Sequence, residues 1–154
     1  MHFYNLIKEL SKKNKIKLFV DMDGVIASYD FGKPLNFKIK RPLKTNIEVL
    51  RKVVSIDNVE LFILSVCRKN YQIEEKNMWL DKNAPFFERH NRYILSKEGI
   101  QDASSANIKL QFLKKYIIKE NEKIVFVDDD NKVLSTVAKE LHNIILLQDS
   151  ELID

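Results

Sequence analysis

The sequence predicts an α/β fold in which a parallel sheet of about five strands lies between two layers of helices. Two observations lead there. Segments with helical periodicity alternate with short apolar runs, and runs such as 124–127 and 144–147 are apolar at consecutive positions, as in strands buried on both faces. The chain has 154 residues, of which 45% are hydrophobic, enough for one core. We therefore expect a single three-layer, Rossmann-like domain over residues 1–154.

The first half of the chain begins with a helix, because Phe3, Leu6, Ile7 and Leu10 recur at helical spacing. An apolar strand follows and ends at Asp21. Two of the three glycines and two of the three prolines then lie in residues 24–42, which predicts irregular structure there. The expected elements are a helix over 3–13, a strand over 16–20, a helix over 43–55 and a strand over 59–66.

The second half continues the alternation with a helix, a short strand and a long amphipathic helix that Ser104 or Ser105 caps. An apolar strand then leads into Asp128, and a final helix and strand complete the pattern. The expected helices cover residues 71–82, 104–120 and 131–141, and the expected strands cover 92–95, 123–127 and 143–147.

Aspartates cluster where two of the expected strands end. The first strand runs into Asp21-Met22-Asp23-Gly24, and a later one runs into Asp128-Asp129-Asp130. Ligands bind at the carboxyl ends of parallel strands, so we expect up to five carboxylates to face each other there. A lone aspartate would be interpreted as a helix cap or turn residue. Two like charges about 4 Å apart repel by roughly 4 kcal/mol, so the cluster needs a cation, and all-oxygen ligands favour Mg²⁺.

These segments resemble the motifs of the haloacid dehalogenase (HAD) superfamily, the aspartate-nucleophile phosphatases. VDMDGV resembles the first motif and LFILS the second. A lysine before the fourth strand, 123–127, corresponds to the third motif, and VFVDDD resembles the fourth. The segment ILSVCRKNYQIEEKNMWLDKNAP is similar to bacterial and phage proteins grouped with the type C 5′-nucleotidases, or deoxyribonucleotidases. The resemblance covers nearly the whole chain and implies a HAD-like fold.

The resemblance implies a catalytic role for each carboxylate. Asp21 would attack phosphorus and form an aspartyl-phosphate, while Asp23 would protonate the leaving oxygen and later deprotonate water. Mg²⁺ would be held by Asp21, the backbone carbonyl of Asp23 and Asp128, with Asp129 close by or binding through water. Acidic neighbours are expected to raise the pKa of Asp23 so that it can act as an acid.

Two further side chains would contact the phosphate. The resemblance implies that Ser65 donates a hydrogen bond to the phosphoryl group and that a lysine neutralises it. Lys109 lies early in the helix before the fourth motif, where the family places this lysine. Lys97, which follows a short strand, is the alternative.

Members of the family often insert a cap domain between the first two motifs, but too few residues separate these motifs here for a full cap. We expect residues 25–42 to form a short flap in its place. We therefore expect a capless or minimally capped protein with an open site. The flap interleaves Tyr29, Phe31 and Phe37 with Lys33, Lys38, Lys40 and Arg41, a pattern that suits a nucleotide or a single strand. The alternative is that the aromatic rings pack the flap down and the lysines are solvated.

The expected function is a Mg²⁺-dependent phosphomonoesterase acting on a small phosphorylated substrate, with (deoxy)nucleoside monophosphates favoured. Larger substrates, such as a polynucleotide end or a phosphoprotein, and a non-catalytic basic binding module on the same fold are the alternatives. The net charge of +4 permits nucleic acid as a partner without favouring it. The single cysteine predicts a cytoplasmic setting, and no apolar run is long enough for a membrane span. Capless HAD proteins often use a partner subunit as a lid, so the resemblance is compatible with a homo-oligomer, although the sequence does not fix the oligomeric state.

Overall fold

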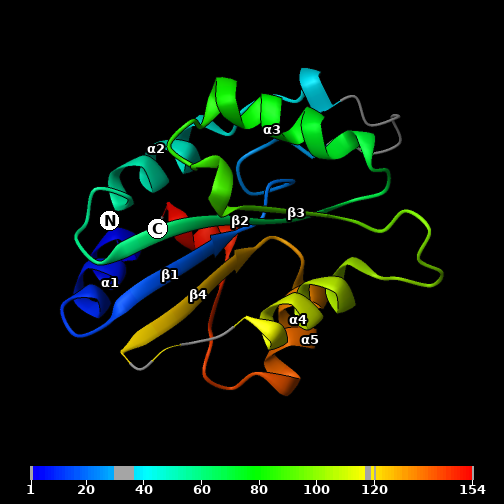
Figure 1. The fold of residues 1–154 in the computed structure, drawn as a ribbon. Helices are drawn as coiled ribbons and strands as arrows, with labels where there is room; N and C mark the ends of the chain where they lie inside the picture. Colours follow the sequence, from blue (N-terminus) through cyan, green and yellow to red (C-terminus); the bar gives the residue numbers. More distant parts are fainter. Residues whose placement is uncertain (1, 30–36, 117–118, 120, 154) are drawn as a thin grey trace.

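The computed structural model describes residues 2–29, 37–116, 119 and 121–153. Within them, five parallel strands form one sheet in the order β3-β2-β1-β4-β5 (Figure 1). The strands are β1 (Lys15–Val20), β2 (Val59–Cys67), β3 (Arg92–Ser96), β4 (Glu122–Asp128) and β5 (Ile145–Gln148). The helices are α1 (His2–Ser11), α2 (Lys44–Val53), α3 (Tyr71–Asn83), α4 (Ser105–Lys115) and α5 (Asn131–Glu140), with short 3-10 turns η1 (Phe37–Ile39), η2 (Arg89–Asn91) and η3 (Asp149–Leu152).

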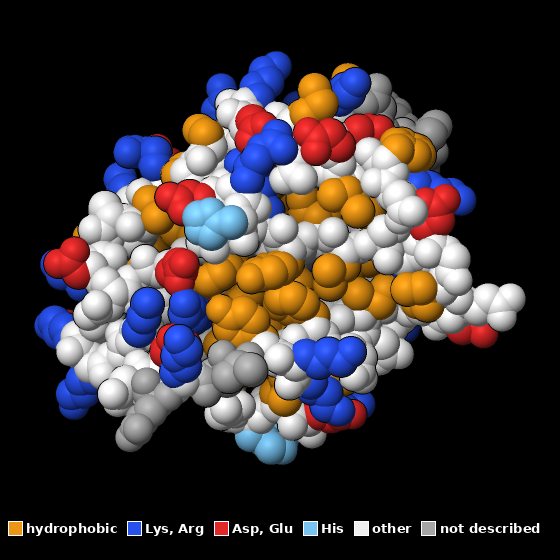
Figure 2. Space-filling model, in the orientation of Figure 1, with side chains coloured by type: hydrophobic (Ala, Val, Ile, Leu, Met, Phe, Trp, Pro, Cys, Tyr) orange, Lys and Arg blue, Asp and Glu red, His pale blue; other side chains and the backbone are white. Residues whose placement is uncertain are grey.

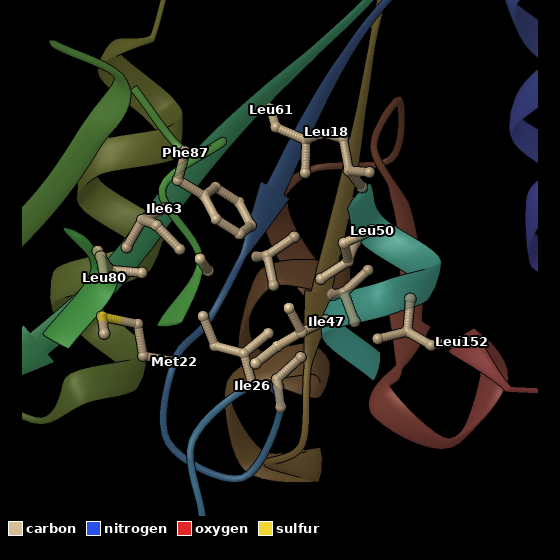
Figure 3. Packing of buried hydrophobic residues seen from close by; sticks show 14 of the residues in the cluster. Leu18, Met22, Ile26, Ile47, Leu50, Leu61, Ile63, Leu80, Phe87 and Leu152 are labelled. Atoms are coloured by element: carbon tan, nitrogen blue, oxygen red, sulfur yellow. The ribbon is translucent and has the colours of Figure 1, made fainter. Parts of the chain in front are cut away.

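The central strands bury side chains on both faces of the sheet, which confirms the predicted three-layer α/β fold. Leu18 of β1 and Ile63 of β2 point into a core shared with α1, α2 and α3. Phe19 and Phe62, the adjacent residues, point into a second core shared with α4 and α5. In Figure 1, α2 and α3 lie above the sheet and α4 and α5 below it, and Figure 3 shows Leu50 of α2 packed among the first set.

The predicted helix over 104–120 is too long at its carboxyl end. Helix α4 ends at Lys115, and Tyr116 has an extended backbone with φ −73° and ψ 119°. The ring of Tyr116 packs edge-on against Phe19 at 5.1 Å between ring centroids, so the aromatic side chain enters the lower core as the chain leaves the helix. Residues 117, 118 and 120 of the predicted helix lie outside the described part of the chain.

The predicted flap over 25–42 is described only at its two ends, since residues 30–36 lie outside the described part. The ends lie side by side: the Ser28 N–H donates to the Arg41 carbonyl at 2.8 Å, and the Leu43 N–H donates to the Ile26 carbonyl at 2.7 Å. The two described ends of this segment are therefore hydrogen-bonded to each other, next to the loop that follows β1.

Hydrophobic side chains gather across the middle of the face shown in Figure 2. Partly buried Tyr93 and Leu95 of the edge strand β3 and Phe112 of α4 are among those packed at the lower core. No helix in the described part of the chain has the length and apolar character to cross a membrane.

Candidate active site

The register of β1 and β4 brings the first and last acidic segments together. Val20 pairs with Val127 in a parallel arrangement, so Asp21 and Asp128 follow at neighbouring strand ends. The Asp21 N–H continues the ladder by donating to the Val127 carbonyl at 3.0 Å. Two segments about a hundred residues apart in the sequence thus meet at one edge of the sheet, as expected for parallel strands.

Three carboxylates converge at this edge. One oxygen each from Asp21, Asp128 and Asp129 lies within 4.8 Å of the others. Gly24 makes room for this group: its φ is +79°, and a Cβ atom there would lie 2.1 Å from Asp129 Oδ2. Hard oxygen donors at this spacing fit Mg²⁺, which binds proteins through a few carboxylates and keeps several waters. The donor set therefore suits the cation that the sequence predicts.

Lys109 of α4 lies between two of these carboxylates. Its ammonium group donates to Asp128 Oδ2 at 2.7 Å and lies 3.1 Å from Asp21 Oδ1, with its side chain 4% exposed. Ser104 is the N-cap of helix α4: its hydroxyl accepts from the Asn107 N–H at 3.1 Å and so caps the first turn of the helix that carries Lys109. Lys97, the alternative, makes no ion pair with an acidic side chain of the described residues.

Burial controls the protonation of the acidic group. It raises the pKa of Asp21 to about 7, with Asp128 and Asp23 adding to the rise and Lys109 opposing it. Burial and the charge of Asp21 raise the pKa of Asp129 to about 6, and burial also raises the pKa of Asp128. For Lys109, burial acts to lower the pKa, but the two neighbouring carboxylates outweigh it and the pKa rises. A divalent cation would favour the ionised carboxylates.

Asp23 does not join the acidic group through its side chain. Its two carboxylate oxygens accept from two lysines: Oδ1 from Lys40, and Oδ2 from Lys76 at 3.1 Å. The sequence-based expectation of a raised pKa is wrong for this arrangement. Burial acts to raise the pKa of Asp23, but Lys76 and Lys40 together lower it below its ordinary value.

Ser65 is fully buried within β2 and does not line the cleft beside the acidic group. Its hydroxyl accepts from the Lys76 ammonium group at 2.7 Å, and the same ammonium donates to the Val66 carbonyl at 3.2 Å. Ser65 is therefore hydrogen-bonded to Lys76, and the same ammonium group links it to Asp23.

Asp130 is the fifth carboxylate expected in the cluster, and its side chain has a different partner. Its oxygen accepts from the Lys132 N–H at 2.8 Å, which makes it the N-cap of α5. The Asp130 N–H in turn donates to Asp128 Oδ1 at 2.9 Å and holds that side chain. The cap interpretation, considered for a lone aspartate, is correct at this position.

Lys40 and Lys76 were not singled out as partners of the acidic motif by sequence reasoning. Lys76 lies in the middle of α3 and Lys40 lies in the predicted flap, so neither is near Asp23 in the sequence. The alternative interpretation of residues 25–42, with packed aromatic rings and solvated lysines, is correct for Phe37, which is buried, and wrong for Lys40, which is also buried. A weak signal existed for Lys76, a cation placed just before Trp79 and Leu80 on the buried side of a helix.

An open cleft of about 670 Å³ lies over the acidic group. Tyr29 contributes to its wall and is 56% exposed, and Ser105 at the start of α4 lines another part. The acidic residues Asp21, Asp23, Asp128, Asp129 and Asp130 all line it, together with Val66, Lys109, Asn131 and Val133. A phosphate group entering this cleft would reach Asp21 and Lys109 together.

Sequence comparison finds no matching family model and no matching curated protein. Comparison with solved structures finds similar folds. A chain in the structure of the Pnkp1/Rnl/Hen1 RNA repair complex matches with a TM-score of 0.67 and 18% identity over 88% of this chain and 42% of that one. A chain in a further structure of the Pnkp1/Rnl/Hen1 complex matches with a TM-score of 0.67 and 16% identity over 88% and 46%, so this chain spans less than half of either.

The third similar structure is the HAD domain of the effector protein Lem4 from Legionella pneumophila. It matches with a TM-score of 0.52 and 14% identity, over 87% of this chain and 84% of that one. At these identities the similarity concerns the fold. Together with the sheet order and the layers of helices, it shows that this chain has the α/β, Rossmann-like fold of a HAD domain.

Proposed function

We propose that this protein is a Mg²⁺-dependent phosphomonoesterase of the HAD superfamily that acts through an aspartyl-phosphate on Asp21. One observation carries the proposal: Asp21 lies at the end of a central strand, in an open cleft, beside both Lys109 and a carboxylate group suited to Mg²⁺. A purely structural ion pair would explain why buried Lys109 contacts Asp128. It would not explain why Asp21, Asp23 and Asp129 line the same cleft.

The proposed first step is attack of an Asp21 carboxylate oxygen on phosphorus. The bond from phosphorus to the leaving oxygen breaks, and that oxygen takes a proton from Asp23. In the second step water attacks the aspartyl-phosphate, Asp23 takes the proton from water, and the Asp21 carboxylate is released with inorganic phosphate. Lys109 stays beside the nucleophile and the transferring group in both steps, where its charge stabilises the phosphoryl oxygens.

Charge balance supports a dianionic substrate. Four carboxylates (Asp21, Asp23, Asp128 and Asp129) and three lysines (Lys40, Lys76 and Lys109) carry a formal net charge of −1. Mg²⁺ held by Asp21, Asp128 and Asp129, with the Asp23 carbonyl as a further ligand, would bring the site to +1 and supply Lewis-acid stabilisation of the phosphate. The approaching dianion would also offset the two lysines beside Asp23 and favour its protonated form for the first step.

We propose (deoxy)nucleoside monophosphates as the substrates, in keeping with the resemblance to type C 5′-nucleotidases. The position of Tyr29 supports this, because an exposed aromatic side chain lines the cleft that holds the phosphate-reactive residues. Nucleobases stack on aromatic rings and gain about 1–3 kcal/mol per base.

A polynucleotide end is the second candidate substrate. The cleft is open, and the similar chains with a TM-score of 0.67 come from an RNA repair complex. An end of a strand could enter an open cleft with its terminal phosphate at Asp21 while the rest of the strand stays in solvent.

The direct test is hydrolysis of p-nitrophenyl phosphate with and without Mg²⁺. We expect Mg²⁺-dependent turnover in the wild type and a loss of at least about a thousandfold in Asp21→Asn, which removes the nucleophile but keeps the size of the side chain. Lys44→Ala, a substitution of an exposed lysine at the start of α2, is the matched control. Absence of metal-dependent turnover above the Asp21→Asn level would favour the binding-module alternative.

A substrate panel separates the two candidates. It compares deoxynucleoside monophosphates, ribonucleoside monophosphates, 5′- and 3′-phosphorylated oligonucleotides and glycerol phosphate at equal concentration. The nucleotidase proposal expects higher kcat/KM for the monophosphates. Equal rates on glycerol phosphate would contradict it, and higher rates on oligonucleotides would favour the polynucleotide end.

A further inference from the structure

Lys40 is a buried cation near the end of the predicted flap, residues 25–42. It follows η1, and its side chain is only 3% exposed. Moving an ammonium group out of water costs several kcal/mol unless the charge is paired and hydrogen-bonded. Its burial therefore requires partners that offset this cost.

Asp23 is the acidic partner of Lys40 in the described part of the chain. The Lys40 ammonium group pairs with Asp23 Oδ1. It also lies 4.9 Å from the ring centroid of Phe37 and 5.9 Å from that of Tyr29, distances at which an aromatic ring attracts a cation. The lysine is thus held between one carboxylate and two aromatic rings.

The two oxygens of Asp23 are held from two different elements. Lys40 holds Oδ1 from the segment after η1, whereas Lys76 holds Oδ2 from α3. The Lys76 ammonium group uses its remaining N–H donors on Ser65 Oγ and the Val66 carbonyl. Anchors on both oxygens fix the plane of the carboxylate, and the Lys40 anchor depends on where residues 37–42 lie.

Residues 37–42 are docked on α3 through Trp79. The indole N–H of Trp79 donates to the Lys40 carbonyl at 2.9 Å, and the Phe37 ring packs edge-on against the indole at 5.8 Å between centroids. Phe37 is 2% exposed. Lys40 is therefore fixed through its backbone by Trp79 and through its side chain by Asp23.

We propose that Lys40 is a positioning residue that aims the Asp23 carboxyl group at the leaving oxygen, so that docking of residues 37–42 on α3 completes the site. This inference rests on the proposed function, in which Asp23 supplies the proton as the bond from phosphorus to the leaving oxygen breaks. Lys40 does not line the cleft and would not touch substrate. It acts through Asp23.

The leaving group distinguishes positioning from a general structural role. The p-nitrophenolate anion leaves without needing a proton, whereas an alkoxide leaving group depends on general acid catalysis, which contributes about 10²–10⁴-fold. We expect Lys40→Ala to lower kcat for glycerol phosphate by at least about tenfold and kcat for p-nitrophenyl phosphate by less than about threefold. KM should change little for either ester, because Lys40 lies outside the cleft.

Matched variants and an optical signal complete the experiment. Lys40→Arg keeps the charge and should restore part of the lost turnover on glycerol phosphate, while Lys44→Ala should have no effect on either ester. Trp79 is the single tryptophan of the chain, so its fluorescence reports whether residues 37–42 remain docked. We expect the emission of Lys40→Ala to stay close to that of the wild type, because Phe37 still packs on the indole.

The possible outcomes separate the two proposals. Equal losses on both esters with red-shifted emission would show that Lys40 only holds the fold. Unchanged turnover on both esters would show that Asp23 is oriented without Lys40. Either result overturns the positioning role and leaves the proposed function standing, provided that Asp21→Asn is inactive. Full activity of Asp21→Asn would overturn the proposed function and the positioning role together.

Discussion

Gly24 shows how closely one residue can control the acidic group. Its backbone adopts φ +79°, and the Asp129 carboxylate occupies the space that a side chain at this position would need. A left-handed backbone favours glycine, and the close approach of Asp129 adds a second requirement that is independent of the first. The turn after β1 and the position of the Asp129 carboxylate therefore both require that residue 24 has no side chain.

We predict that Gly24→Ala weakens Mg²⁺ binding by displacing Asp129, in addition to a strain cost of about 1–3 kcal/mol. Gly99→Ala is the matched control, because Gly99 has the same φ of +79° and nothing within 4 Å of an added Cβ. Urea unfolding measures the strain in both variants, and calorimetric titration measures Mg²⁺ affinity. Equal Mg²⁺ affinity in the two variants would contradict the prediction.

Single residues differ in how well the sequence predicts them. Asp21, Asp128 and Asp129 could be grouped because each follows an apolar strand, and parallel strands end at the same edge. Lys40 and Lys76 could not be assigned to Asp23, because no periodicity relates a loop lysine and a mid-helix lysine to a distant strand end. Their partner became visible only through side-chain contacts.

Helices α4 and α5 each begin beside the site, and their caps place the residues that hold the carboxylates. Ser104 caps the helix that carries Lys109, and Asp130 caps α5 while its backbone N–H holds Asp128. The sequence predicted both helices, and the prediction of α4 used its apolar spacing. It overestimated α4 because the apolar residues continue past Lys115, whereas Tyr116 turns into the aromatic core.

We predict that Asp130→Ala destabilises the protein by about 1 kcal/mol, the usual cost of losing an N-cap, with little change in Mg²⁺ affinity. Asp130→Ser keeps an oxygen at the cap and should restore most of the stability. Urea unfolding and calorimetric Mg²⁺ titration of both variants test this. A large loss of Mg²⁺ affinity in Asp130→Ser would instead make Asp130 a metal ligand.

The stability of the whole molecule is linked to the acidic group. Burial raises the pKa of Asp21 to about 7, from a reference value of 3.8, and the pKa of Asp129 to about 6. Between the reference and folded values these groups bind more protons in the folded state than in the unfolded state. Their contribution to the free energy of unfolding is therefore present at low pH and is lost as the pH rises through the folded pKa values.

We predict that the metal-free protein loses stability as the pH rises from about 5 to 8, and that Asp129→Asn reduces this slope. Mg²⁺ favours the ionised carboxylates, so its affinity and its stabilising effect should increase over the same range. Urea unfolding at several pH values, with chelator and with saturating Mg²⁺, tests both statements. A metal-free stability that rises with pH over this range would contradict them.

The sheet order has a consequence for how the protein is made. Strand β1 lies between β2 and β4, and in its parallel pairing with β4 Lys15 lies opposite Glu122. During synthesis, β1 and β2 can emerge and pair while β4 is still inside the ribosome. At that stage Asp21 lacks its neighbours Lys109 and Asp128. A nascent chain stalled before Asp128 should therefore contain a partly formed sheet but no assembled acidic group.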